Sequence, residues 1–149
     1  MSKSIKNYTS SWTANKSVSE IQALLAENGA EKIMIDYNGG EPVSVTFAIK
    51  TSRGLLPFCF PANVEKVEAI FLENKKPKHS WEASKLNVVE KEQAKRTAWK
   101  NIYDMIAVQM ALIKTNQVKL EQLMLGFSPI YQQFESGNLK LESGNEENL

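Results

Sequence analysis

The stretch from Lys32 to Ile49, KIMIDYNGGEPVSVTFAI, decides the fold. In its first part, isoleucines and a tyrosine alternate with Lys32, Met34 and Asp36, and in its second part apolar residues alternate with small ones. A period of two is typical of strands that bury one face. Asn38-Gly39-Gly40 separates the two parts, and Asn and Gly tolerate the positive φ angles of a tight hairpin. The stretch therefore predicts two antiparallel strands.

A third strand is expected directly after this hairpin. Residues 51–54 form a second turn signal, and the run from Leu55 to Phe60 is almost entirely apolar. Pro57 lacks an amide hydrogen, which favours an edge position for this strand. Cys59, the only cysteine, lies in the same run and is expected to be a core thiol. The sequence thus predicts a three-stranded meander.

Before the meander we expect a short strand and a helix. The segment from Tyr8 to Thr13 is rich in Ser, Thr and aromatic residues, which favours a strand that joins the sheet. Ser17 and Glu20 have the spacing of a capping box, and apolar residues follow at helical spacing. The predicted helix runs from about Val18 to Asn28, and Gly29 suits the position just past its end.

After the meander we expect three helices. Asn63 can cap the first, which fades near residue 74; residues 75–87 contain a proline and several lysines and predict an exposed loop. Apolar residues at helical spacing then predict a long helix over 88–114. A last helix is expected over 117–125, with Asn116 as its cap and Gly126 as its end.

Together these elements predict an α+β fold, a three- to four-stranded antiparallel meander with helices packed on one face, in the order β-α-β-β-β-α-α-α. At 149 residues the chain fits one domain, expected over 1–135. Residues 136–149 are rich in Gly, Asn, Glu and Ser and predict a flexible acidic tail.

The composition argues against several classes of protein. One histidine and one cysteine cannot supply a zinc site, and no phosphate-binding glycine motif is present. We therefore expect no enzyme, no metal and no cofactor. The N-terminus lacks the apolar region of a secretory signal, and no apolar run is long enough to span a bilayer, so a cytoplasmic location without membrane contact is expected.

Positive charge gathers between residues 75 and 100, where eight cations face three glutamates. Such a cluster on one helix and the loop before it can follow a phosphate backbone, and a tryptophan there can stack on a base. The candidate nucleic-acid-binding residues are Lys75, Lys76, Lys78, Trp81, Lys91, Lys95, Arg96 and Lys100. The competing interpretation is an ordinary solvated helix surface, in which Glu92 pairs with Arg96. Trp99 is expected in the core.

One motif carries a family resemblance. The run Glu92-Gln93-Ala94-Lys95-Arg96-Thr97-Ala98-Trp99-Lys100, with Leu56-Pro57-Phe58 and Pro61-Ala62-Asn63 before it, resembles a family of small phage and prophage proteins without an assigned activity. The resemblance implies a mobile-element gene that is expressed in the cytoplasm of a bacterial host cell. It implies no catalytic residue.

Two functions from different classes remain open. The first is a non-enzymatic nucleic-acid-associated accessory protein of a phage or mobile element, which binds DNA or RNA through the basic helix face. The second is a protein-binding module that inhibits a host enzyme or defence system. It would use an exposed sheet edge or the aromatic segment from Phe127 to Phe134.

Overall fold

The computed structural model describes residues 5–52, 54–73, 80–120 and 122. For residues 80–87 it describes the backbone only. Its element order is α1 (Ala14–Glu27), β1 (Ala30–Asn38), β2 (Glu41–Thr51), β3 (Gly54–Pro61), α2 (Val64–Glu73) and α3 (Ser80–Lys114). The three strands form one antiparallel sheet in the order β1-β2-β3. The predicted α+β class and meander are confirmed, as is the edge position of the strand that contains Pro57.

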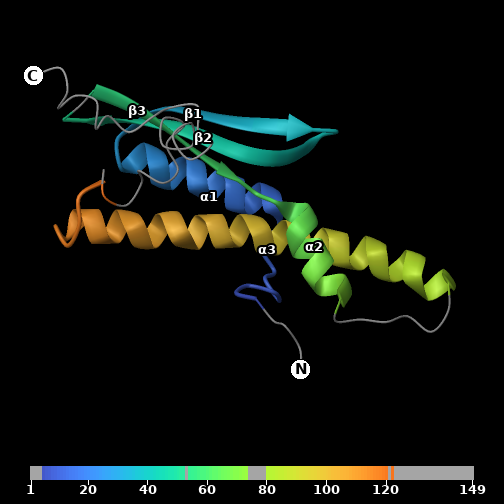
Figure 1. Ribbon diagram of the computed structural model, residues 1–149. Coiled ribbons are helices and arrows are strands. Elements are labelled where there is room, and N and C mark those ends of the chain that lie inside the picture. The colour runs from blue at the N-terminus through green and yellow to red at the C-terminus, as the bar shows by residue number, and fades with distance from the viewer. Residues whose placement is uncertain (1–4, 53, 74–79, 121, 123–149) are drawn as a thin grey trace, which may run out of the picture.

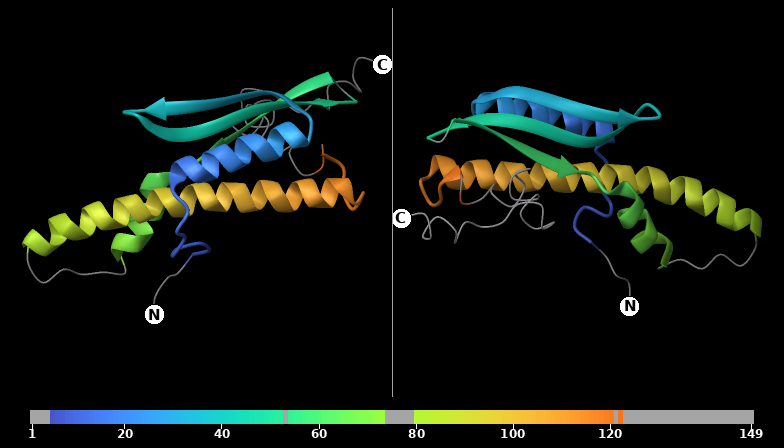
Figure 2. Two further views of the ribbon diagram at one scale, coloured as in Figure 1. Left: turned by 180° about the vertical axis from the view of Figure 1, so that it is seen from behind. Right: turned by 45° about the horizontal axis from the view of Figure 1, so that its top comes forward.

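Helices α1 and α3 lie beneath one face of the sheet (Figure 1). The register places apolar side chains from all three strands on that face, among them Phe47, Phe58 and Phe60. They pack against Ile21 of α1 and Trp99 of α3, both fully buried. Burial of these side chains in one contiguous core supplies the main driving force for the fold. Helix α2 packs against α3, whose N-terminal half extends beyond the sheet (Figures 1 and 2).

The hairpin between β1 and β2 forms where the glycines predicted it. Asn38 pairs with Glu41, and the two residues between them, Gly39 and Gly40, have φ angles of 60° and 81°. Both values lie in the left-handed region that a two-residue turn of this type requires. The pairing of β1 with β2 is irregular at two places, between Ala30 and Lys32 and between Asp36 and Tyr37. The five residues from Lys32 to Asp36 pair without interruption.

The N-terminal part of the chain differs from the prediction. Residues 6–9 form turns and not a strand, so the sheet has three strands and the first element is a helix. Asn7 has a φ angle of 65°, which breaks the extended conformation that the Ser- and Thr-rich composition favoured. Helix α1 also begins four residues early, because the hydroxyl of Thr13 accepts a hydrogen bond from the Lys16 amide at 3.1 Å and caps it. The predicted cap, Ser17, lies buried inside the helix.

The predicted exposed loop over residues 75–87 is wrong from Ser80 onward, because α3 begins there. No glycine or proline occurs between Ser80 and Lys114, so nothing in that stretch stops the helix. Residues 74–79 lie outside the described part of the chain.

The end of α3 also corrects a prediction. Asn116 adopts a φ angle of 58°, and the Gln117 amide donates back to the Leu112 carbonyl at 3.0 Å. This pattern ends a helix on its C-terminal side. Asn116 therefore ends α3 and does not cap a following helix. Of the predicted last helix over 117–125, residues 117–119 are not helical and residues 120 and 122 are helical. Residues 121 and 123–125 lie outside the described residues, as do the segment from Phe127 to Phe134 and the predicted acidic tail.

Cys59 is only half-buried and is not a core thiol. Side chains alternate along β3, so Phe58 and Phe60 face the core while Cys59 lies on the opposite, outer face of the sheet. The apolar run predicted a buried strand with Cys59 in the core. The described helices cover only one of them (Figure 2).

Candidate functional site

The predicted phosphate-binding lysines of α3 have different surroundings. The Lys95 ammonium lies 3.0 Å from the Glu41 carboxylate and 3.4 Å from that of Glu92. The hydrogen bond to Glu41 raises the pKa of Lys95, against a smaller opposing effect of burial. Its side chain is only 16% exposed. The charge of Lys95 is thus paired in a contact that joins α3 to the β1–β2 hairpin.

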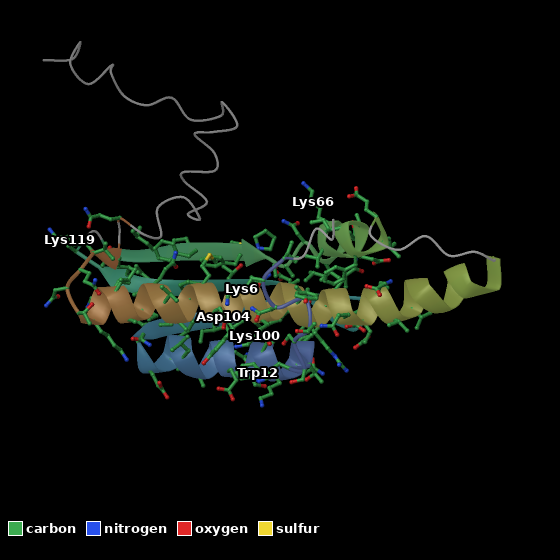
Figure 3. The ribbon with its side chains drawn as sticks, turned by 90° about the horizontal axis from the view of Figure 1, so that it is seen from below. Lys6, Trp12, Lys66, Lys100, Asp104 and Lys119 are labelled. Atoms are coloured by element: carbon green, nitrogen blue, oxygen red, sulfur yellow. The ribbon has the colours of Figure 1, made fainter. Side chains whose placement is uncertain are left out.

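Lys100 is engaged more completely (Figure 3). Its ammonium lies 2.8 Å from Asp104, 4.0 Å from the ring centre of Trp12 and 4.7 Å from that of Tyr103. The rings of Trp12 and Tyr103 contact each other, with their centres 5.1 Å apart. Cation–π contacts of this kind stabilise a partly desolvated ammonium. Lys100 therefore anchors Trp12 on α3, and its charge is compensated inside the cluster.

Asp104 balances this cluster. Burial of Asp104 raises the pKa of its carboxyl, but the opposing hydrogen bonds from Lys100 and Asn7 prevail, so the net pKa lies below the ordinary value. Lys6 adds a longer ion pair at 3.6 Å. The carboxylate is thus held charged by three groups from two segments of the chain.

The other predicted residues fall into four groups. Lys91 is exposed. Arg96 is half-buried, and its Nε is buried without a hydrogen-bond partner among the described residues. Trp81 lies in the first turn of α3. The remaining candidates lie outside the described residues: Lys75, Lys76 and Lys78.

Gln93 and Thr97 of the Glu92–Lys100 motif, together with Asn101 and Asp104 of the next helical turn, bind the N-terminal segment, residues 5–12. Gln93 donates to the Ser10 carbonyl at 3.1 Å, and Thr97 donates to the Asn7 carbonyl at 2.9 Å. The side-chain amide of Asn7 in turn donates to the side-chain oxygens of Asn101 and Asp104, in both cases at 2.8 Å. These contacts explain why the motif contains polar residues at helical spacing.

The apolar member of the motif is buried, as predicted. Trp99 is 0% exposed, and its indole N–H donates to the Pro42 carbonyl at 3.2 Å. Together with the pair between Lys95 and Glu41, this bond fixes the start of β2 on α3. Most side chains of the Glu92–Lys100 motif thus have a structural explanation.

The outer face of the sheet presents a different kind of surface. One row across it consists of Met34, Thr46 and Cys59, and the next consists of Lys32, Ala48 and Pro57. No described helix covers this face. The large exposed apolar side chain of β1 on this face is Met34, at 55% exposure; Tyr37, also on β1, is 59% exposed.

Strand β1 also has an open edge. In the described sheet it pairs with β2 only, so its other side offers backbone amide and carbonyl groups to a further strand. Lys32 and Asp36 flank Met34 on the outer face and are both exposed. Pro57 indicated the edge formed by β3, and no comparable signal in the sequence singled out the edge of β1.

Among the hollows of the described surface, one of about 280 Å³ lies between Val43 and the start of α2, and another of about 520 Å³ lies along α3 between Lys6 and Leu112. Both linings are mostly apolar. The polar residues that line the second include Lys6, Asn101 and Asp104, which already bind one another or Asn7. A small ligand is usually held by several convergent polar groups, and these three are already engaged.

The described residues hold no cluster of three or more His, Cys, Asp or Glu side chains placed to bind a metal ion. None of the helices in the described part of the chain combines the length and apolar composition needed to cross a bilayer. No family model, curated protein or solved structure matches the chain. The open side of β1 and the single exposed lysine among the four cations predicted on α3 are the features to which a function can be assigned.

Proposed function

We propose that the chain is a non-enzymatic protein-binding module that adds a strand of a partner protein to the open edge of β1. The observation that carries this proposal is the combination of an unpaired strand edge with exposed Met34 and Tyr37. Backbone hydrogen bonds give such a complex affinity, and the side chains beside the edge give it specificity.

The charges of β1 define the partner strand. In an antiparallel pairing, a residue opposite Lys32 is favoured when it is acidic, and one opposite Asp36 when it is basic. Met34 favours an apolar residue opposite the centre. The strand that fits thus carries a basic residue, three apolar or β-branched residues and an acidic residue, in that order.

The test is titration of the isotope-labelled protein with two short capped peptides, monitored by amide chemical shifts. The first peptide is Thr-Lys-Val-Val-Val-Asp-Thr, and the control, Thr-Asp-Val-Val-Val-Lys-Thr, has the same composition with its charges exchanged. The first peptide is expected to shift the amides of residues 31–37, with an affinity at least about 10-fold above that of the control. Equal affinities, or shifts elsewhere on the protein, would contradict the proposal.

The partner's setting follows from the resemblance to phage and prophage proteins. We propose that the module acts in the cytoplasm of a bacterial host and that its partner is a host protein. Inhibition of a host enzyme or defence system is the form of activity that this setting favours.

A second candidate, binding of DNA or RNA, rests on the exposure of Lys91 on α3. It is tested by fluorescence anisotropy with labelled single-stranded DNA, duplex DNA and duplex RNA over about 50 to 200 mM salt. Sub-micromolar binding that weakens steeply with salt supports phosphate contacts. Absence of binding to all three removes this candidate.

A further inference from the structure

The five residues of β1 that pair regularly with β2 are Lys32, Ile33, Met34, Ile35 and Asp36. This stretch is complementary to itself when two copies run antiparallel about Met34. Lys32 of one copy then lies opposite Asp36 of the other, Ile33 lies opposite Ile35, and Met34 lies opposite Met34. We propose that a second copy of this chain is a partner of the β1 edge and forms a two-fold symmetric dimer. This inference rests on the proposed function and names one strand that satisfies it.

The charges support this occupant. Lys32 and Asp36 are both exposed and lie on the same face of β1, two residues on either side of Met34. Charged residues on an edge strand normally prevent its pairing with other strands. In this register, however, opposite charges meet at both ends of the contact. The two-fold axis makes each pair occur twice.

The apolar residues of the stretch fit the same register. The half-buried Ile33 and Ile35 lie on the core-facing side, and the exposed Met34 lies on the outer side. Residues directly opposite each other in antiparallel strands have Cβ atoms about 4.5–5.5 Å apart, so both isoleucine pairs and the methionine pair come into contact. The dimer then contains one six-stranded sheet with the strand order β3-β2-β1-β1-β2-β3.

The irregularities of the sheet limit the length of the contact. The register between β1 and β2 shifts between Ala30 and Lys32 and again between Asp36 and Tyr37. Such irregularities twist a strand and interrupt its pairing. The dimer contact is therefore confined to about five residues in each copy, which gives a small interface and a weak, concentration-dependent dimer.

The experiment is sedimentation velocity of the full chain and its charge variants over about 5 µM to 1 mM, the range suited to small interfaces. The wild type is expected to shift from monomer to dimer within this range. Lys32→Asp places two aspartates opposite each other at both ends, and Asp36→Lys does the same with two lysines. Each variant alone is expected to raise the dimer dissociation constant about 30-fold.

Combining the charges restores complementarity in two ways. The double variant Lys32→Asp/Asp36→Lys is expected to dimerise like the wild type. An equimolar mixture of the two single variants is expected to form a heterodimer, because every contact then joins an aspartate to a lysine. Lys50→Asp, an exposed charge reversal on the central strand β2, is the matched control and is expected to dimerise normally.

Dimers that persist in both single variants, or single variants that fail to combine in the mixture, would show that this register is wrong. A wild type that stays monomeric up to about 1 mM overturns the inference. In that case the peptide titration still distinguishes the two ideas: charge-ordered peptide binding to the monomer preserves the proposed function, and its absence removes both. Circular dichroism of each variant confirms that the fold is intact, since both substituted side chains are exposed.

Discussion

Helix α3 and strand β1 use their polar groups in opposite ways. From Gln93 to Asp104, the polar side chains of α3 bind the N-terminal segment, and Lys95 binds the hairpin. Strand β1 leaves one complete edge unpaired within the described sheet and exposes Lys32, Met34 and Asp36. The region with the more conspicuous sequence motif therefore stabilises the molecule, and the region with an ordinary strand sequence offers the surface for a partner.

The difference teaches how to interpret a conspicuous sequence motif. A helix that holds a separate segment needs polar residues at fixed spacing, and this requirement alone produces a specific pattern. A binding edge needs little sequence specificity, because the backbone supplies most of its hydrogen bonds. Substitutions in α3 should therefore change stability, and substitutions in β1 should change association.

The largest expected effect is at Trp99. Trp99→Ala removes a fully buried side chain and its bond to the Pro42 carbonyl, so it should lower the free energy of unfolding by about 3–5 kcal/mol. Trp99→Phe keeps most of the packing and should cost only about 1–2 kcal/mol. Urea unfolding measures both. If Trp99→Ala left stability unchanged but altered association, the contrast between the two regions would be lost.

The attachment of the N-terminal segment should show a smaller effect. Thr97→Val keeps the shape of a fully buried side chain but removes the donor to the Asn7 carbonyl, so it should cost about 1 kcal/mol. It should also speed tryptic cleavage near Lys6, because the segment is held less firmly. Thr9→Val, a matched change at an exposed residue, should stay within about 0.5 kcal/mol of the wild type. Equal effects of the two variants would contradict this role of Thr97.

Much of the fold could be predicted from local patterns. The alternation of apolar and polar residues around Asn38-Gly39-Gly40 is sufficient to predict the hairpin. The helical spacing of apolar residues after residue 88 is sufficient to predict most of α3. The error in the N-terminal segment occurred where a tertiary contact decides the structure. The turns of residues 6–9 are held by Thr97 and Asp104, about ninety residues away, and local composition contains no trace of that contact.

The site was harder to predict, because charge in a sequence does not reveal its partner. Lys95 and Lys100 were expected to be available for phosphates, yet both are paired with carboxylates. The pairing of Lys100 with Asp104 is visible at a spacing of four residues on a helix. The pairing of Lys95 with Glu41 joins two elements far apart in the chain and needed the structure.

Asp104 allows the role of the motif to be tested by pH. Its pKa is lowered in the folded protein, so its contribution is present above the unfolded pKa and is lost as pH falls through the folded value. The stability gap between the wild type and Asp104→Asn should therefore be constant near neutral pH and should shrink as the pH falls below about 4, the ordinary pKa of an aspartate. Urea unfolding at several pH values measures it.

Asp36→Asn is the matched control for that series, because Asp36 is exposed and bonds to a neighbouring serine on the sheet. A gap for Asp104→Asn that stayed constant down to pH 2 would show that its carboxylate does not stabilise the cluster with Lys100 and Asn7. In that event the N-terminal segment would be held by hydrogen bonds to Gln93 and Thr97 alone.

The smallest effects separate two lysines that lie four residues apart on α3. Lys95→Gln removes a partly exposed ion pair, so it should cost about 0.5 kcal/mol and leave polyanion binding unchanged. Lys91→Gln should not change stability, because the side chain is exposed. If the protein binds nucleic acid, Lys91→Gln should reduce the log–log salt dependence by about one unit, since one phosphate contact is lost. A larger loss of nucleic-acid binding in Lys95→Gln than in Lys91→Gln would contradict the assignment of Lys95 to its contact with Glu41. It would move the candidate nucleic-acid surface onto the side of α3 that faces the hairpin.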